Sequence, residues 1–184
     1  MSRLLAADSV LLVVDVQDKL LAAIPESGAL VRDIAFLAKA ARLLNVPVIG
    51  TEQYPKGLGS TTADLLPLLS QPPIAKVAFS CLGAEPFKDL LGSLTARQVV
   101  VVGIEAHVCV LQTVLDLIDA GREVFLAVDA VRSRRAADRE TAIRRCERAG
   151  AVLTSAETVA FEWLRGADHP SFKAVSQLVK DRPI

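Results

Sequence analysis

The chain has 184 residues, of which 52% are hydrophobic, 23% charged and only 4% aromatic. This length suits one domain of ordinary size with an aliphatic core, and the high apolar content excludes intrinsic disorder. The 21 basic residues equal the 21 acidic residues. We therefore expect no nucleic-acid partner, because binding to nucleic acid needs an excess of basic charge opposite the phosphates.

No apolar run approaches the roughly 20 residues of a membrane-spanning helix, and the first residues do not resemble a secretory signal. We therefore expect a cytoplasmic protein without a membrane partner. The three cysteines, Cys81, Cys109 and Cys146, are an odd number without CxxC spacing, which argues against a disulfide framework or a zinc ribbon. Each cysteine is therefore treated as a thiol.

Short aliphatic runs alternate with segments of helical periodicity along the chain. The runs predict six strands, at residues 9–16, 46–51, 74–79, 98–102, 124–128 and 151–154. Apolar residues at helical spacing predict helices at residues 29–44, 87–95, 108–120, 136–149, 155–164 and 171–180. Aliphatic strands without polar alternation are typical of parallel strands covered on both faces. We therefore predict an α/β fold, a doubly wound, mainly parallel six-stranded sheet (Rossmann-like) in the order 3-2-1-4-5-6 with helices on both faces.

Two further segments stand out. Residues 53–73 hold four of the nine prolines and no histidine, and they predict a long surface loop of the kind that often carries substrate contacts. Residues 132–148 are rich in arginine interleaved with acidic residues at helical spacing. This pattern predicts an exposed, salt-bridged helix or a subunit contact rather than a nucleic-acid site.

Three residues at predicted strand ends could carry chemistry. Asp15 closes the first strand, where open α/β sheets bind ligands, although an aspartate there could equally cap the following turn. Lys76 lies inside an aliphatic run and must either face a polar cavity or extend its amine to solvent from an edge strand. Cys109 follows the fourth strand in the first turn of a predicted helix, which would lower its thiol pKa; the alternative is a small buried apolar residue. Because strands one and four are neighbours in the predicted order, Asp15 and Cys109 would face one crevice with Lys76.

The motifs around these residues resemble the isochorismatase-like cysteine hydrolases along nearly the whole chain. They are VVDVQ around Asp15, KVAFS around Lys76, GIEAHVCV around Cys109 and TEQYPKGLGST at residues 51–61. The last of these, with SAETVAFEWL and HPSFK near the end, is most similar to the isochorismatase-domain-containing proteins of undetermined substrate. The resemblance implies that residues 1–184 form a single hydrolase domain.

The resemblance also implies a catalytic triad. Cys109 would attack a carbonyl carbon, Asp15 would transfer the proton, and Lys76 would balance the charge. A cis peptide would join Ile104 and Glu105, and the backbone N–H groups of Glu105 and Cys109 would form an oxyanion hole. The implied reaction is metal-independent hydrolysis of a small amide, carbamoyl or related C–N bond through a thioester.

The sequence departs from relatives of this family in two ways. Nicotinamidases carry metal-binding Asp and His residues after the second strand, whereas the loop at residues 53–73 has no histidine, so we expect neither a metal nor another cofactor. Isochorismate-cleaving relatives lack the cysteine, so Cys109 argues against enol-ether hydrolysis. The family also implies a homo-oligomer.

Five further residues fall near the predicted crevice and are candidates to line a substrate pocket: Gln17, Glu52, Tyr54, Phe79 and His107. For the aromatic residues packing is the competing interpretation, and for Glu52 it is an ion pair with an arginine. Two alternatives to catalysis remain for the whole protein. One is a non-catalytic small-molecule-binding or scaffold protein of the same fold, and the other is a redox-sensing thiol protein in which Cys81 resolves oxidised Cys109.

Overall fold

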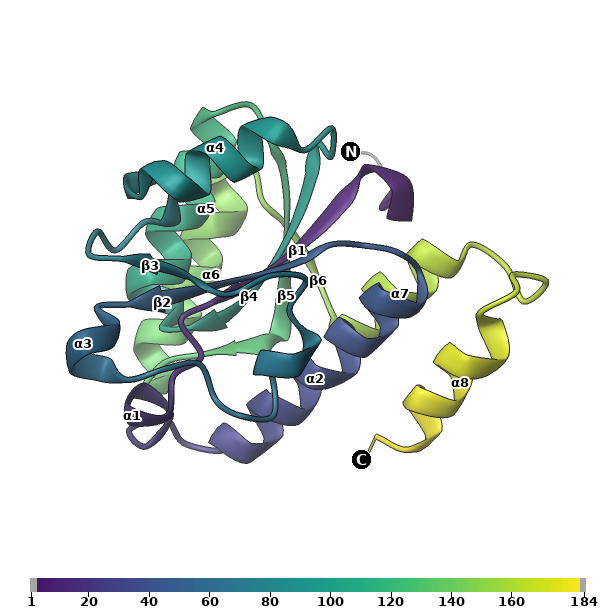
Figure 1. The fold of residues 1–184 in the computed structure, drawn as a ribbon, viewed down its shortest axis with the longest axis horizontal. Coiled ribbons are helices and arrows are strands. Elements are labelled where there is room, and N and C mark those ends of the chain that lie inside the picture. Colours follow the sequence, from purple (N-terminus) through teal and green to yellow (C-terminus); the bar gives the residue numbers. More distant parts are fainter. Residues whose placement is uncertain (1–2, 183–184) are drawn as a thin grey trace.

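The computed structural model describes residues 3–182 as one six-stranded sheet with helices on both faces (Figure 1). Its strands are β1 (Ser9–Val14), β2 (Val48–Gln53), β3 (Ile74–Lys76), β4 (Gln98–Ile104), β5 (Glu123–Arg132) and β6 (Val152–Thr154). Its α-helices are α1 (Asp18–Leu21), α2 (Ser27–Leu43), α3 (Pro55–Leu58), α4 (Glu85–Ser93), α5 (Leu111–Asp119), α6 (Ala136–Ala149), α7 (Ala156–Leu164) and α8 (Phe172–Lys180). Every strand pair in the sheet is parallel, and the order is β3-β2-β1-β4-β5-β6. The predicted fold class and strand order are therefore confirmed.

The two faces of the sheet have separate aliphatic cores because side chains alternate along each strand. Leu11 and Val13 of β1 belong to the core under α2, α7 and α8, whereas Val10, Leu12 and Val14 belong to the core under α4, α5 and α6. In β1 and β4 every residue is buried. This double burial explains why the two strands read as continuous aliphatic runs.

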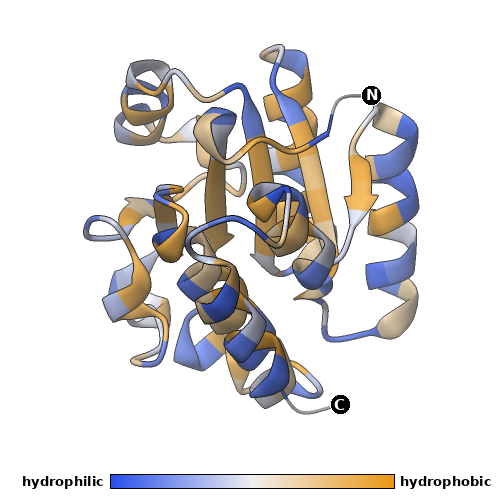
Figure 2. Cartoon of the chain, turned by 90° about the vertical axis from the view of Figure 1, so that its right-hand side faces the viewer, coloured by the Kyte–Doolittle hydropathy of each residue, from blue (hydrophilic) through white to orange (hydrophobic). Residues whose placement is uncertain are grey.

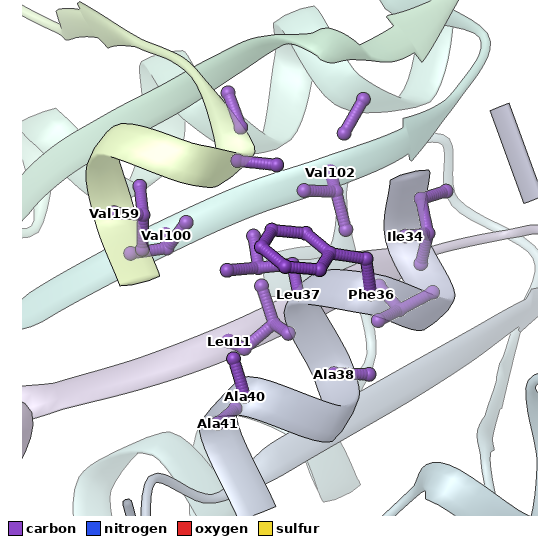
Figure 3. Packing of buried hydrophobic residues seen from close by; sticks show 14 of the residues in the cluster. Leu11, Ile34, Phe36, Leu37, Ala38, Ala40, Ala41, Val100, Val102 and Val159 are labelled. Atoms are coloured by element: carbon purple, nitrogen blue, oxygen red, sulfur yellow. The ribbon is translucent and has the colours of Figure 1, made fainter. Parts of the chain in front are cut away.

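Figure 3 shows the packing of the first core. Phe36 of α2 belongs to the same buried cluster as Leu11 of β1 and Val100 and Val102 of β4, and it is 5% exposed. Burial of such a side chain contributes about 2 kcal/mol to folding. In Figure 2 the apolar colour is concentrated on the strands, while the polar colour alternates along the outer helices. The helices are therefore amphipathic covers for an apolar sheet.

Most predicted elements are confirmed, and the differences lie at their ends. The helix predicted at residues 136–149 has those bounds, and Gly150 after it adopts a φ of 114°. The second strand extends to Gln53, whereas the third ends at Lys76, so Phe79 lies in a loop. The helix predicted from residue 108 begins at Leu111 and is preceded by a one-turn π-helix, Ala106–Val110.

None of the helices within residues 3–182 has the length and apolar character needed to cross a bilayer.

Gly103 allows β4 to approach β1 closely near the carboxyl ends of the two strands. It has a φ of 117° and pairs with Val14, and a Cβ atom at this position would overlap the backbone of Val14. Only glycine tolerates both the positive φ and the close contact. Since Asp15 follows Val14 directly, this contact also fixes the backbone position of Asp15.

We expect Gly103→Ala to lower the free energy of unfolding by about 2 kcal/mol or more, through strain and overlap with Val14. Urea denaturation measures the effect. Gly92→Ala is the matched control, because Gly92 lies in α4 and a Cβ there meets no other atom. The control should be neutral or stabilising by up to about 1 kcal/mol. Equal effects of the two substitutions would contradict the role of Gly103.

Candidate active site

The carboxyl ends of three neighbouring strands bring Asp15, Lys76 and Thr51 together. Asp15 follows β1 with a φ of 52°, and Lys76 is the last residue of β3. Between them lies β2, whose Gln53 is in register with Lys76. A crevice at this edge is where open α/β sheets place their ligands.

Lys76 and Asp15 form a fully buried ion pair. The Lys76 Nζ lies 2.6 Å from Asp15 Oδ2, and both side chains are 0% exposed. Nζ also donates to Gln53 Oε1 at 2.7 Å and to the carbonyl oxygen of Phe79 at 2.9 Å. Thr51 donates its hydroxyl proton to Asp15 Oδ1 at 2.8 Å. The pair therefore has hydrogen-bonding partners for both of its charged groups, as a buried ion pair requires.

Cys109 joins this pair from the other side of β1. It lies in the π-helix that follows β4, beyond a cis peptide between Ile104 and Glu105, and it is 5% exposed. Its Sγ is 3.9 Å from Gln53 Oε1, the same oxygen that accepts from Lys76. The structure therefore brings Asp15, Lys76 and Cys109 into one buried cluster.

The expected low pKa of Cys109 is wrong. Burial raises the pKa of its thiol most, and the Asp15 carboxylate raises it further through its charge and through a hydrogen bond, while Lys76 opposes these effects. Cys109 does lie near the amino end of a helical segment, because the π-helix continues directly into α5, but burial and the Asp15 charge outweigh that effect. Burial and the Asp15 carboxylate therefore both favour the protonated thiol, and Asp15 is the carboxylate that acts on it.

Sequence reasoning missed Thr51 and Gln53, which hold the buried pair. Side chains alternate along a strand, so Thr51 and Gln53 share one side of β2 while Glu52 points to the other. The sequence analysis instead selected Glu52. Alternation counted back from the strand end would have identified the two polar residues on the Lys76 side.

Gln17 and Glu52 fasten the long loop after β2. The Gln17 side chain is 0% exposed, donates to the carbonyl oxygens of Gln53 and Gly59, and accepts from the Gln53 N–H. Glu52 Oε1 accepts from the N–H and the hydroxyl of Thr61 at 2.6 and 2.9 Å. Both side chains are thus hydrogen-bonded to the loop, and no arginine pairs with Glu52 within residues 3–182.

The other three pocket candidates, Tyr54, Phe79 and His107, are more exposed than the buried cluster. Tyr54 and Phe79 are each 52% exposed, on either side of β3 in the chain. His107 is half-buried, and its Nδ1 lies 3.0 Å from the hydroxyl of Ser133. Glu105 pairs with Arg134 at 3.1 Å.

The remaining cysteines differ in their surroundings. Cys81 is fully buried beside the cluster, with its Sγ 3.6 Å from the Thr51 hydroxyl, and burial raises its pKa to about 11. Cys146 lies in the apolar core under α6, where burial also raises its pKa to about 11. All three thiols are free. No group of three or more His, Cys, Asp or Glu side chains within the described residues is arranged to hold a metal ion.

We expect Lys76→Met to destabilise the protein by about 3 kcal/mol, because it leaves the buried Asp15 carboxylate without its cation. Asp15→Asn in the same chain should restore part of this loss, since the uncompensated charge is then gone. A double-mutant cycle from urea denaturation measures the coupling. Additive effects would contradict a coupled buried pair.

We expect iodoacetamide to label Cys109 more slowly at pH 7 than an exposed thiol, at a rate that keeps rising above pH 9. Asp15→Asn should speed labelling at a given pH and Lys76→Met should slow it, because the two charges act on the thiol pKa in opposite directions. Peptide mass mapping separates the cysteines, and the more deeply buried Cys81 and Cys146 serve as internal controls. A rate for Cys109 that reaches its plateau below pH 7 would contradict the raised pKa.

This chain is similar to known proteins over most of its length. The isochorismatase domain family matches residues 9–158. The chain is 39% identical over 181 residues to isochorismatase domain-containing protein 2 of Homo sapiens, covering 98% of this chain and 87% of that protein. It is 38% identical over 186 residues to the secreted isochorismatase effector Isc1 of Phytophthora sojae, covering 98% and 89%. Among solved structures, the MAR1 ribonuclease of Caenorhabditis elegans matches with a TM-score of 0.93 and 41% identity, covering 100% of this chain and 95% of that one.

The match spans the strands that carry Asp15, Lys76 and Cys109, and it extends over more than half of the chain. The predicted family is thus confirmed: the chain belongs to the isochorismatase domain family of isochorismatase-like hydrolases.

Proposed function

We propose that the protein is a metal-independent cysteine hydrolase that cleaves a small amide, carbamoyl or related C–N bond through a Cys109 thioester. One observation carries the proposal: the buried Cys109 Sγ lies 3.9 Å from Gln53 Oε1, the oxygen that accepts from Lys76 of the buried ion pair with Asp15. A nucleophile beside a base that is itself held by a third group is the usual arrangement for covalent catalysis.

In the first half of the reaction the C–N bond is broken. Asp15 takes the proton of the Cys109 thiol as Sγ bonds to the carbonyl carbon, and the carbonyl oxygen becomes an oxyanion. The oxyanion is stabilised by the backbone N–H groups of Glu105 and Cys109. When the C–N bond breaks, Asp15 returns the proton to the leaving nitrogen, which departs as ammonia or an amine.

In the second half the thioester is hydrolysed. A water molecule gives a proton to Asp15 as its oxygen bonds to the carbonyl carbon, and the carbon–sulfur bond then breaks. The thiolate regains the proton from Asp15. Lys76 holds the Asp15 carboxylate in place through the ion pair and takes no part in the proton transfers, so that the cluster is restored without an external group.

The raised pKa of Cys109 fits this sequence of steps. A thiol that is neutral in the free protein becomes a thiolate only as it attacks, so Asp15 must remove its proton at that moment. The small exposed fraction of Cys109, 5%, favours a substrate with a small reacting end. No cofactor takes part in the proposed reaction.

We also propose that the protein is a cytoplasmic homo-oligomer without a nucleic-acid or membrane partner. The loop after the edge strand β3 presents Val77, 78% exposed, next to the half-exposed Phe79. Exposed apolar side chains at a sheet edge support association between copies of the chain.

We expect Cys109→Ala to abolish hydrolysis of any primary amide or carbamoyl compound that the wild type turns over, with a fall in kcat of at least about a thousandfold. Release of ammonia measures turnover across a panel of small amides and carbamoyl compounds. Cys146→Ala, which removes a thiol remote from the cluster, should retain turnover. A Cys109→Ala protein with wild-type rates would refute the thioester.

The same preparation tests the two alternatives. Saturable binding of panel compounds without product would favour a binding or scaffold protein. A Cys109–Cys81 disulfide after mild peroxide, found by peptide mass mapping, would favour a redox sensor. A single-stranded RNA is included as a substrate because of the name of the Caenorhabditis elegans structure. RNA cleavage that survives Cys109→Ala would place that activity outside the proposed mechanism.

A further inference from the structure

We propose that Arg132 and Arg139 form an anion-binding subsite next to the Cys109 turn, which selects amide substrates that also carry a carboxylate. The nature of the substrate rests on the proposed function, whereas the subsite depends only on the geometry of β5 and α6. The arrangement begins with an irregularity in β5.

The ladder between β4 and β5 is interrupted near the carboxyl ends of the strands. Val101 pairs with Leu126 and Gly103 pairs with Val131, so two steps along β4 correspond to five along β5. A strand segment that leaves its ladder in this way loses partners for its backbone groups. Carbonyl oxygens in such a segment need other donors if they are not solvated.

The two arginines supply those donors. Arg132 Nη1 donates to the carbonyl oxygens of Asp129 and Val131 at 2.9 and 3.0 Å. Arg139 Nε donates to the carbonyl oxygen of Val131 at 2.9 Å, and its Nη2 donates to that of Val128. Both guanidinium groups are therefore fixed in orientation by the irregular segment, and neither is free to turn away.

Neither guanidinium group has a carboxylate partner within residues 3–182. The ion pairs of the described residues do not include Arg132 or Arg139, so the expectation of a salt-bridged helix at residues 132–148 is wrong for these two positions. Burial lowers the pKa of Arg139 most and the positive charge of Arg132 lowers it further, while the charges of Glu140 and Asp129 oppose this shift without outweighing it. Two fixed cations that repel each other and retain unused N–H groups are suited to a shared anion.

A cavity of about 480 Å³ lies at these arginines. It is lined by Pro25 and Glu26 from the connection between β1 and α2, and by Ser133, Ala136 and Arg139 from the connection between β5 and α6 and from α6 itself. Both connections leave the sheet at the carboxyl ends of parallel strands. The cavity therefore lies over the same edge as Asp15 and Cys109.

Three contacts tie the cavity to the turn that carries the thiol. Arg132 is in register with Ile104, the residue before Glu105. The hydroxyl of Ser133, in the cavity wall, lies 3.0 Å from His107 Nδ1. Helix α6 packs against the π-helix Ala106–Val110. An anionic group held at the arginines is therefore adjacent to the segment that presents the nucleophile.

The two acidic side chains that line the cavity, Asp129 and Glu26, form no ion pair with Arg132 or Arg139 among the described residues. Asp129 already accepts from the Ala156 N–H through Oδ1 and pairs with Arg182 through Oδ2, both at 2.9 Å or less. Glu26 is exposed and forms no ion pair with either arginine among the described residues. In addition, no side chain caps α6, whose first residue, Ala136, lines the cavity, so the positive helix end adds to the field.

The test uses Cys109→Ala protein, which lacks the nucleophile of the proposed reaction, and titration calorimetry with two matched amides. Succinamate carries a carboxylate opposite its amide group, and succinamide carries a second neutral amide. We expect succinamate to bind more tightly. Arg132→Gln in this background should weaken succinamate about tenfold or more and leave succinamide unchanged, because only the anion loses a charged hydrogen bond.

Arg148→Gln is the matched control, since Arg148 is an exposed arginine on α6, the helix that carries Arg139, and the same unit of charge is removed. It should change neither affinity. Glu26→Gln is a second variant that leaves the irregular segment of β5 intact, and it should tighten succinamate several-fold by removing a nearby negative charge. This variant decides the question if Arg132→Gln does not fold.

The subsite is refuted if succinamate shows no saturable binding or no preference over succinamide, or if Arg148→Gln costs as much affinity as Arg132→Gln. These readings do not depend on turnover. Failure of the Cys109 mechanism would appear as absent hydrolysis with anion selectivity retained, whereas failure of the subsite would appear as hydrolysis without anion selectivity.

Discussion

The buried ion pair between Lys76 and Asp15 is the constraint on which the rest of the structure depends. Neither charge reaches solvent, so the carbonyl of Phe79, the amide of Gln53 and the hydroxyl of Thr51 must all be in place. These groups come from the ends of β1, β2 and β3 and from the loop that follows. Because a buried charge without partners costs several kcal/mol, the register of these three strands and the pair stabilise one another.

The same cluster decides the chemistry available to Cys109. Burial and the Asp15 carboxylate raise the pKa of the thiol, while the amide of Gln53 contacts both the lysine and the sulfur. In the proposed mechanism the protonated thiol is inert until a substrate arrives, and the Asp15 carboxylate then acts as the base. The long loop after β2, which begins at Gln53 of this cluster, is held by Gln17 and Glu52.

A second polar arrangement lies over the same sheet edge. At β5 the ladder is irregular, and the exposed carbonyl oxygens are bound by guanidinium groups and not by a neighbouring strand. The edge therefore combines an ion pair at β1 and β3 with two arginines at β5 and α6 that form no ion pair among the described residues. The apolar cores on the two faces keep both arrangements rigid, because every residue of β1 and β4 between them is buried.

The sequence by itself determined the parallel sheet, its order and the convergence of Asp15, Lys76 and Cys109, because aliphatic periodicity and the rules for parallel crossovers are local properties. It also pointed to the family through motifs that lie beside those three residues. Only the tertiary structure decided the direction of the Cys109 pKa, the roles of Thr51 and Gln53, and the pairing of the arginines with β5 carbonyls. These depend on distances between side chains from different strands and on burial, and no spacing along one chain encodes a dielectric environment.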